Sequence, residues 1–135
     1  MMLDPVSDIP VISIVDDDES IRDVISSLIR SFGLKAHAFV SAEEFLQSPH
    51  LSETSCLISD VQMPNMNGIE LQRVLIAQGR RIPIIFITAF PDEKAEASAM
   101  KAGAICFLSK PFDGHEIIKH LAKAIEEPGI DTSEI

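Results

Sequence analysis

The sequence predicts an α/β domain built around a five-stranded, doubly wound parallel sheet with five helices. Two observations lead to this fold class. Short apolar runs alternate five times with segments whose apolar residues recur at helical spacing, which is typical of a parallel sheet covered by helices on both faces. The chain also has 135 residues, of which 46% are hydrophobic, and this is the size and composition of one domain with one compact core.

The first half of the chain contains two strand and helix pairs. Residues 11–15 form a β-branched run typical of a buried strand, and the helix after it ends at Gly33, a common C-terminal cap. Residues 34–40 alternate as a strand, and Ser41 to Glu44 has the capping-box pattern that begins a short helix. The predicted apolar face of the first helix consists of Ile21, Val24, Ile25, Leu28, Ile29 and Phe32.

The middle of the chain is organised around residues 56–60, an apolar run that ends in the carboxylate of Asp60. The run is too short for a helix and is followed at once by turn residues, so it predicts a buried strand. The next helix begins near Asn67 and ends at Gly79, and residues 83–88 predict a fourth strand. The predicted apolar side of that helix consists of Leu71, Val74, Leu75 and Ile76.

The last third of the chain predicts a helix, a strand and a final helix. Residues 92–102 are rich in alanine and contain neither Ile nor Leu, so we expect a weakly anchored and movable helix. Residues 104–108 predict the fifth strand. Asp113 to Glu116 is an acidic form of the capping box, and it begins a helix that Pro128 ends. We therefore expect a lead-in over 1–9, one domain over 10–127 and a flexible tail or linker start over 128–135.

Charge and hydropathy exclude several functions. The formal net charge of −10 argues against direct nucleic-acid binding, which needs a basic face, and suits cations and basic partner surfaces. Residues 82–89 are among the longest apolar runs and fall far short of the roughly 20 residues of a membrane helix. The N-terminus lacks an export signal, so we expect a cytoplasmic protein. Cys56 and Cys106 lie in apolar runs without metal-type spacing, and we expect both in the core.

Polar residues at the predicted strand ends suggest a site. Asp16 and Asp17 follow the first strand, Asp60 ends the third, Thr88 ends the fourth and Lys110 follows the fifth. In parallel α/β sheets the carboxyl edge of the strands is where ligands bind. Each residue alone also has a purely structural interpretation: an aspartate as a helix cap, Thr88 as a β-former and Lys110 as a solvated side chain. Their coincidence at one edge favours the functional interpretation.

Three carboxylates at one edge predict a cation between them. Close carboxylates repel one another, and Mg²⁺ with oxygen ligands would relieve this repulsion while leaving positions for phosphate oxygens. The set fits phosphoryl transfer, in which Asp60 is the nucleophile, Lys110 neutralises a phosphoryl oxygen and Thr88 donates a hydrogen bond. An ionised aspartate needs no general base.

Short motifs stand at the predicted strand ends and turns. They are Ile14-Val15-Asp16-Asp17-Asp18, Asp60-Val61-Gln62-Met63-Pro64 with Asn67-Gly68, Ile87-Thr88-Ala89, Ala102-Gly103-Ala104 and Lys110-Pro111-Phe112. With these motifs the chain resembles the receiver domains of two-component response regulators, the CheY-like family with its flavodoxin-like fold. The resemblance implies the strand order 2-1-3-4-5 and a phosphoryl group accepted from a sensor histidine kinase on Asp60. It also implies Mg²⁺ bound by Asp17, Asp60 and the backbone carbonyl of Gln62, with help from Asp16, and a cis peptide bond before Pro111.

The resemblance also implies a conformational switch. In the family a threonine that moves to the phosphoryl group is coupled to an aromatic residue that turns inward, and these are Thr88 and Phe107 here. Phe107 lacks a hydroxyl, and an ordinary core role remains open for it. Ala89 is small and leaves room for Thr88. Gln62 and Phe90 stand where the family tunes phosphate lifetime, and we expect the bulky Phe90 to hinder water.

Three alternatives compete with the switch. A phosphohydrolase resembling the haloacid dehalogenase group would carry an aspartate where Gln62 stands. A flavodoxin-like nucleotide-binding module would need a phosphate-cradling loop in place of the aspartates. A receiver that works without phosphorylation would not need the full acidic set.

The strand ends of this chain resemble those of receivers in front of helix-turn-helix DNA-binding domains. This resemblance implies transcription control through a domain absent from this chain, with a possible homodimer through the fourth helix, fifth strand and last helix.

Overall fold

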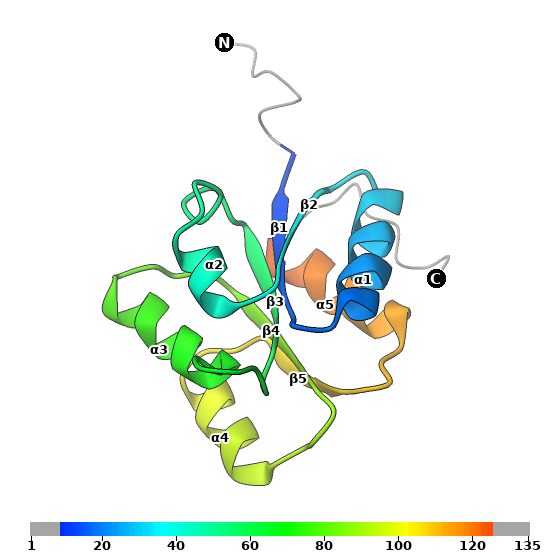
Figure 1. The fold of residues 1–135 in the computed structure, drawn as a ribbon. Coiled ribbons are helices and arrows are strands. Elements are labelled where there is room, and N and C mark those ends of the chain that lie inside the picture. Colours follow the sequence, from blue (N-terminus) through cyan, green and yellow to red (C-terminus); the bar gives the residue numbers. More distant parts are fainter. Residues whose placement is uncertain (1–8, 126–135) are drawn as a thin grey trace.

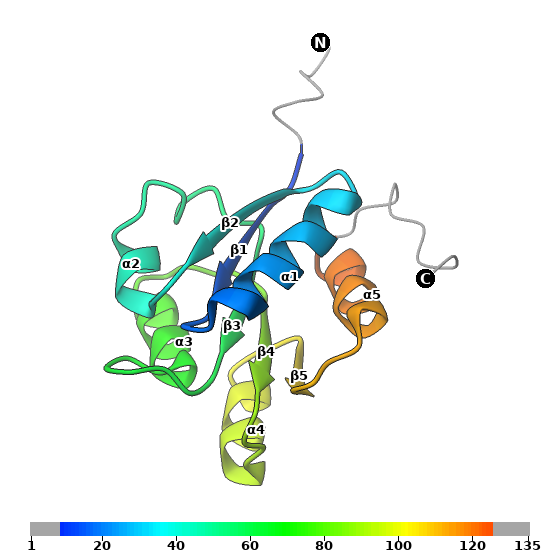
Figure 2. The ribbon, with the colours of Figure 1, turned by 45° about the vertical axis from the view of Figure 1, so that its right-hand side comes forward.

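The computed structural model describes residues 9–125, which form a five-stranded parallel sheet between two layers of helices (Figures 1 and 2). The strand order is β2-β1-β3-β4-β5, as expected. The predicted lead-in, apart from Ile9, and the predicted tail lie outside the described residues. The strands are β1 (Val11–Val15), β2 (Lys35–Phe39), β3 (Cys56–Asp60), β4 (Ile84–Thr88) and β5 (Cys106–Ser109), and the helices are α1 (Glu19–Ser31), α2 (Ala42–Leu46), α3 (Gly68–Ala77), α4 (Glu93–Lys101) and α5 (Gly114–Ile125).

The sheet divides the interior into two hydrophobic clusters. On one face α1 and α5 cover the sheet, with Ile25 and Leu121 among the fully buried side chains. On the other face α2, α3 and α4 cover it, with Phe45 and Leu71 fully buried. The central strands β1, β3 and β4 are buried along their whole length because both faces are covered.

Two residues that the helical pattern placed on apolar faces lie outside the core. Val24 in α1 and Ile76 in α3 are each more than half exposed, so their predicted burial was wrong. The adjacent Ile25 and Leu75 fill the buried stripe of these helices. A neighbour in sequence is rotated by about 100° around the helix and therefore faces solvent.

The helix starts use side-chain caps, as the sequence predicts, with one difference. The Ser41 hydroxyl accepts a hydrogen bond from the Glu44 amide, and Asn67 forms a complete capping box with Glu70. At the start of α5 the Asp113 carboxylate accepts from the amide of His115 and not from that of Glu116. The predicted box is replaced there by a tighter turn.

The expectations for α4, for the two cysteines and for the Lys110–Pro111 bond are met. Only Ala99 of α4 is fully buried, which confirms its thin apolar face. Cys56 and Cys106 are free and buried, and the Lys110–Pro111 peptide bond is cis. No helix within residues 9–125 is long and apolar enough to cross a membrane.

Candidate functional site

The sheet topology brings the predicted strand-end residues together. Asp16 follows β1, Asp60 ends β3, Thr88 ends β4 and Lys110 follows β5. Hydrogen-bonded neighbours in the sheet are β1 and β3, β3 and β4, and β4 and β5, all parallel, so their carboxyl ends meet at one edge. With Asp17 included, this edge holds three carboxylates, a hydroxyl and an ammonium group.

The aspartates form a tight cluster around one lysine. One carboxylate oxygen each from Asp16, Asp17 and Asp60 lies within 4.8 Å of the others. Asp16 is fully buried, Asp60 is 4% exposed and Asp17 is exposed to solvent. Lys110 Nζ lies 2.9 Å from Asp16 Oδ2 and 3.4 Å from Asp60 Oδ2. A single ammonium group thus faces two buried carboxylates.

The charges at this site are incompletely balanced. Burial and the charge of Asp16 raise the pKa of Asp60 to about 6, although Lys110 opposes the rise. Burial lowers the pKa of Lys110, but the hydrogen bond to Asp16 and the charge of Asp60 raise it more, so it lies above its usual value. Asp60 Oδ1 is buried without a hydrogen-bond partner. An orphaned carboxylate oxygen among three acidic groups fits a hard divalent cation with oxygen ligands.

The three aspartates that follow β1 have different local roles. The Asp16 carboxylate accepts a hydrogen bond from the Asp18 amide at 2.8 Å, and Arg22 Nη1 donates to the Asp16 carbonyl at the same distance. Asp18 is the N-cap of α1 and accepts from the amide and hydroxyl of Ser20. The structural role of helix cap therefore falls to Asp18, which leaves Asp17 available to the site.

A hydrogen-bond network connects β4 with the loop after β3. The Thr88 hydroxyl donates to Gln62 Oε1 at 2.6 Å and accepts from the Phe90 amide at 3.0 Å. Gln62 Nε2 in turn donates to the Phe90 carbonyl at 3.4 Å. Thr88 is thus bound to a side chain beside Asp60 and not to Asp60 itself.

The turn after β3 depends on Gly68. A Cβ atom at this position would collide with the backbone carbonyl oxygen of Asp60, and the Gly68 amide donates to the Val61 carbonyl at 2.9 Å. The start of α3 therefore lies directly against the residue that ends β3. Only glycine permits this approach.

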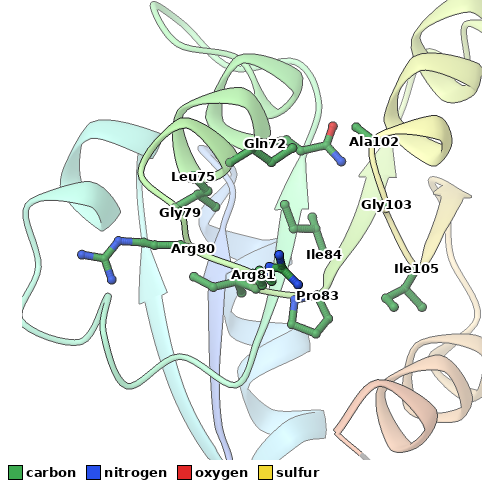
Figure 3. A pocket seen from close by; sticks show the side chains of 12 residues that line it. Gln72, Leu75, Gly79, Arg80, Arg81, Pro83, Ile84, Ala102, Gly103 and Ile105 are labelled. Carbon is green, nitrogen blue, oxygen red and sulfur yellow. The ribbon is translucent and has the colours of Figure 1, made fainter.

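Two hollows lie at opposite edges of the sheet. The one at the carboxyl edge is open and surrounds the aspartate cluster, and its lining includes Asp17, Asp18, Asp60, Gln62, Ala89, Phe90 and Lys110. The other, of about 530 Å³, lies between α3, α4 and the start of β4, and its labelled residues include no acidic side chain (Figure 3). The chemistry-bearing residues therefore belong to the carboxyl-edge hollow.

Comparison with known families decides the identity of this arrangement. A sequence model of the family described as response regulator receiver domain matches residues 12–122. The chain belongs to this family. The match covers all five strands of the receiver domain except the first residue of β1.

Curated relatives of this receiver domain are longer proteins. The response regulator protein TodT of Pseudomonas putida is 43% identical over 116 residues, which cover 86% of this chain and 51% of TodT. The transcriptional regulatory protein FixJ of Bradyrhizobium diazoefficiens is 38% identical over 117 residues, which cover 86% of this chain and 57% of FixJ. The chain spans about half the length of the curated relatives it matches.

Solved structures show the same receiver-domain fold. The response regulator StyR superposes with a TM-score of 0.81 and 41% identity, over 87% of this chain and 59% of that one. FixJ-N superposes with a TM-score of 0.76 and 34% identity, over 93% of this chain and 97% of that one. The fold class and the resemblance to receiver domains are therefore confirmed.

Sequence reasoning on this receiver domain missed some site residues. It expected the backbone of Gln62, but not its side-chain bond to Thr88, and it did not foresee the Arg22 contact with Asp16. Phe107 lies on β5, partly buried, with its ring centroid 5.7 Å from that of Phe86. Neither the Gln62 rotamer nor the reach of Arg22 leaves a signal in residue spacing.

Proposed function

We propose that this receiver domain is a phosphorylation-activated switch that accepts a phosphoryl group on Asp60 from a sensor histidine kinase. The observation that carries the proposal is the environment of the Asp60 carboxylate. It lines the open hollow, one of its oxygens has no partner, and it lies close to Lys110 and to two other aspartates. A carboxylate held in this way is both reactive and in need of positive charge.

The acidic cluster is also the proposed Mg²⁺ site of the domain. The carboxylates of Asp16, Asp17 and Asp60 would supply the hard oxygen ligands that this ion prefers. The family resemblance adds the backbone carbonyl of Gln62 as a further ligand. When bound, the ion neutralises charge on the aspartates and on the incoming phosphoryl group. Three carboxylates and one ammonium group leave enough excess negative charge to hold it.

The phosphoryl transfer itself uses residues of this chain. An Asp60 oxygen attacks phosphorus in line with the phosphorus–nitrogen bond of the kinase phosphohistidine, that bond breaks, and its electron pair stays on the imidazole. Lys110 Nζ already lies 3.4 Å from Asp60 and would neutralise a phosphoryl oxygen. The Thr88 hydroxyl would donate to another oxygen after leaving Gln62. The product is an aspartyl phosphate, and the domain catalyses only its own phosphorylation and dephosphorylation.

We propose that the signal leaves through α4, β5 and α5. In this proposal Thr88 would be coupled to Phe107, which is partly buried beside Phe86. The thin apolar face of α4 makes it the least anchored helix of this surface. Phosphorylation would bias an equilibrium between two arrangements here, and the new surface would bind a partner or a second copy of the domain.

The proposed output is control of transcription. FixJ is a transcriptional regulatory protein by name, and the match covers only 51% of TodT and 57% of FixJ. The domain itself has a net charge of −10, so nucleic acid would be bound by a DNA-binding domain outside this sequence. We place the protein in the cytoplasm, where a sensor kinase would reach it.

Intact mass tests this proposal. The protein is incubated with acetyl phosphate, with and without Mg²⁺, as wild type and as Asp60→Ala, and each sample is also run on size exclusion. A gain of one phosphoryl group that requires both Mg²⁺ and Asp60 supports the switch, and an earlier elution would add dimerisation. Equal gain in Asp60→Ala, or no gain from either acetyl phosphate or a purified cognate kinase, would refute it.

A further inference from the structure

A second cluster of metal-binding side chains lies away from the aspartates. His37 in β2, and His50 and Glu53 in the connection from α2 to β3, each offer a ligand atom within 4.8 Å of the others. Within residues 9–125, this cluster and the aspartate cluster are the two groups of three or more such residues. We propose that His37, His50 and Glu53 form a site for a borderline divalent ion such as Zn²⁺.

Both imidazoles lie close to the same carboxylate oxygen of Glu53. His50 Nδ1 is hydrogen-bonded to Glu53 Oε1, and His37 Nε2 lies 3.6 Å from that oxygen. Ligand atoms about 2.1 Å from a tetrahedral Zn²⁺ are separated by roughly 3.4 Å. The separation of His37 Nε2 and Glu53 Oε1 is therefore already close to the value in a metal site, whereas the His50 ring must turn out of its hydrogen bond with Glu53 to bind the ion.

The two histidine rings lie side by side but must turn before both can bind one ion, because an imidazole binds a metal in the plane of its ring and the two planes are nearly parallel. Their centroids lie 3.7 Å apart and their planes differ by 12°, so the rings are stacked. Stacked rings cannot both carry a charge at low energetic cost. A neutral imidazole with a free nitrogen is the form that binds a metal.

The loop that carries two of the ligands is held by hydrogen bonds. The His50 amide donates to the Ser48 hydroxyl at 3.0 Å, and the Glu53 amide donates to the His50 carbonyl at 3.2 Å. The Thr54 hydroxyl donates to the same carbonyl at 2.8 Å and is hydrogen-bonded to the Ser13 hydroxyl of β1 at 2.7 Å. These hydrogen bonds tie the loop to the sheet and hold the backbone of His50 and Glu53 near His37.

The donor set selects the ion. Two imidazoles and one carboxylate suit Zn²⁺, Ni²⁺ or Cu²⁺, whereas Mg²⁺ prefers oxygen ligands alone. The three side chains are about one third to one half exposed, so an ion can enter and water can complete its coordination. The domain would thus carry two sites of different preference, one acidic and one rich in imidazole.

Zinc titration in excess Mg²⁺ tests the inference, because Mg²⁺ occupies the aspartate cluster. Isothermal titration of the wild type is expected to show one Zn²⁺ per chain. His37→Gln, His50→Gln and Glu53→Gln should each weaken binding at least tenfold. The matched control is His120→Gln, since His120 pairs with Glu116 on α5 without a second imidazole, and it should bind Zn²⁺ as the wild type does.

A second readout separates ligand loss from unfolding. Melting temperatures without metal check that each variant is folded, and the exposed Glu53→Gln is the variant least able to disturb the fold. Co²⁺ in place of Zn²⁺ should give the visible absorption of a four-coordinate site in the wild type and His120→Gln only. Zinc affinities within threefold of the wild type in all three ligand variants would overturn the proposal. Loss of binding in His120→Gln would do so as well.

Discussion

Asp60 has a charge conflict that its neighbours resolve only in part. Its carboxylate is buried beside Asp16 and shares one ammonium group with it, so the charged form is disfavoured in the folded domain. The same features that suit this residue to the proposed phosphoryl group and cation make it a source of instability without them.

The free energy of unfolding should report this conflict. Burial and Asp16 raise the pKa of Asp60 from 3.8 to about 6, so the folded state holds its proton more tightly than the unfolded state. The associated stability is present below about pH 4 and is lost as the pH rises through 6. Without Mg²⁺, Asp60→Asn should therefore be more stable than the wild type at pH 7.5, by at most about 3 kcal/mol, and not at pH 3.8.

Urea denaturation with a chelator at both pH values measures this difference. Added Mg²⁺ should raise the midpoint of the wild type at pH 7.5 more than that of Asp60→Asn. A stability difference that is the same at both pH values would show that the Asp60 charge is not responsible.

Phe90 is expected to influence how long the phosphoryl group lasts. Its backbone is fixed by bonds with Thr88 and Gln62, and its side chain, which is 71% exposed, lines the hollow around Asp60. Removing the ring in Phe90→Ala should admit water and speed dephosphorylation about threefold, or roughly 0.7 kcal/mol in the barrier. Release of phosphate from the purified phosphorylated protein measures the rate. The idea fails if the two rates agree, with Val24→Ala as a remote control.

At the scale of single residues, the sequence predicted which side chains lie together where the sheet topology alone determines their positions. Asp60, Thr88 and Lys110 could be brought together because parallel strands end at one edge. The hydrogen bond from Thr88 to Gln62 could not be predicted, because the rotamer of an exposed loop side chain depends on the packed structure. His37 and His50 are thirteen residues apart, and only the path of the loop places their rings together.

The helices differ in how firmly they are attached to the sheet, as their sequences predict. The buried stripe of α5 is formed by Ile117, Ile118 and Leu121, whereas α4 fully buries only Ala99. We expect amide hydrogens in α4 to exchange faster than those in α5. Exchange followed by mass spectrometry or NMR tests this, and equal protection of the two helices would contradict the proposed mobility of α4.

The turn between β3 and α3 should tolerate no side chain at Gly68. Gly68→Ala places a methyl group against the Asp60 carbonyl, so either the strand end or the helix start must shift. We expect a loss of roughly 2 to 4 kcal/mol in the free energy of unfolding, measured in urea. Gly79→Ala is unsuitable as a control because Gly79 has a positive φ of 76°. The control is Ala77→Gly at the end of α3, which is expected to lower the free energy of unfolding by only about 1 kcal/mol. A Gly68→Ala variant as stable as the wild type would contradict the proposed close approach.

Element boundaries were less predictable than element order. The fifth strand was predicted over 104–108, but β5 runs from Cys106 to Ser109, because the Ala104 amide still closes α4 by bonding to the Ala99 carbonyl. Apolar residues continue across this junction, so hydropathy does not mark where the helix cap ends and the strand begins. The order of the elements along the chain and the parallel orientation of the strands followed from the alternation of strand and helix patterns.

At the scale of the molecule, the site and the proposed output surface share the strands β4 and β5. Thr88 ends one of them, and Phe107 lies on the other opposite Phe86. The two hydrophobic clusters lie on opposite faces of the sheet, and Phe107 contacts the cluster beneath α4. In the proposed switch, a change at Asp60 would reach α4 through this strand pair, whereas α1 and α2 pack against β1 and β2.

Amide NMR spectra with and without beryllofluoride and Mg²⁺ test this account most directly, since beryllofluoride forms a phosphoryl-like adduct with a carboxylate. The account predicts shifts at the carboxyl edge and across α4, β5 and the start of α5, with α2 and the Asp60→Asn variant unchanged. Shifts confined to the residues around Asp60 would contradict the proposed switch, and the same shifts in Asp60→Asn would contradict the proposed phosphoryl site.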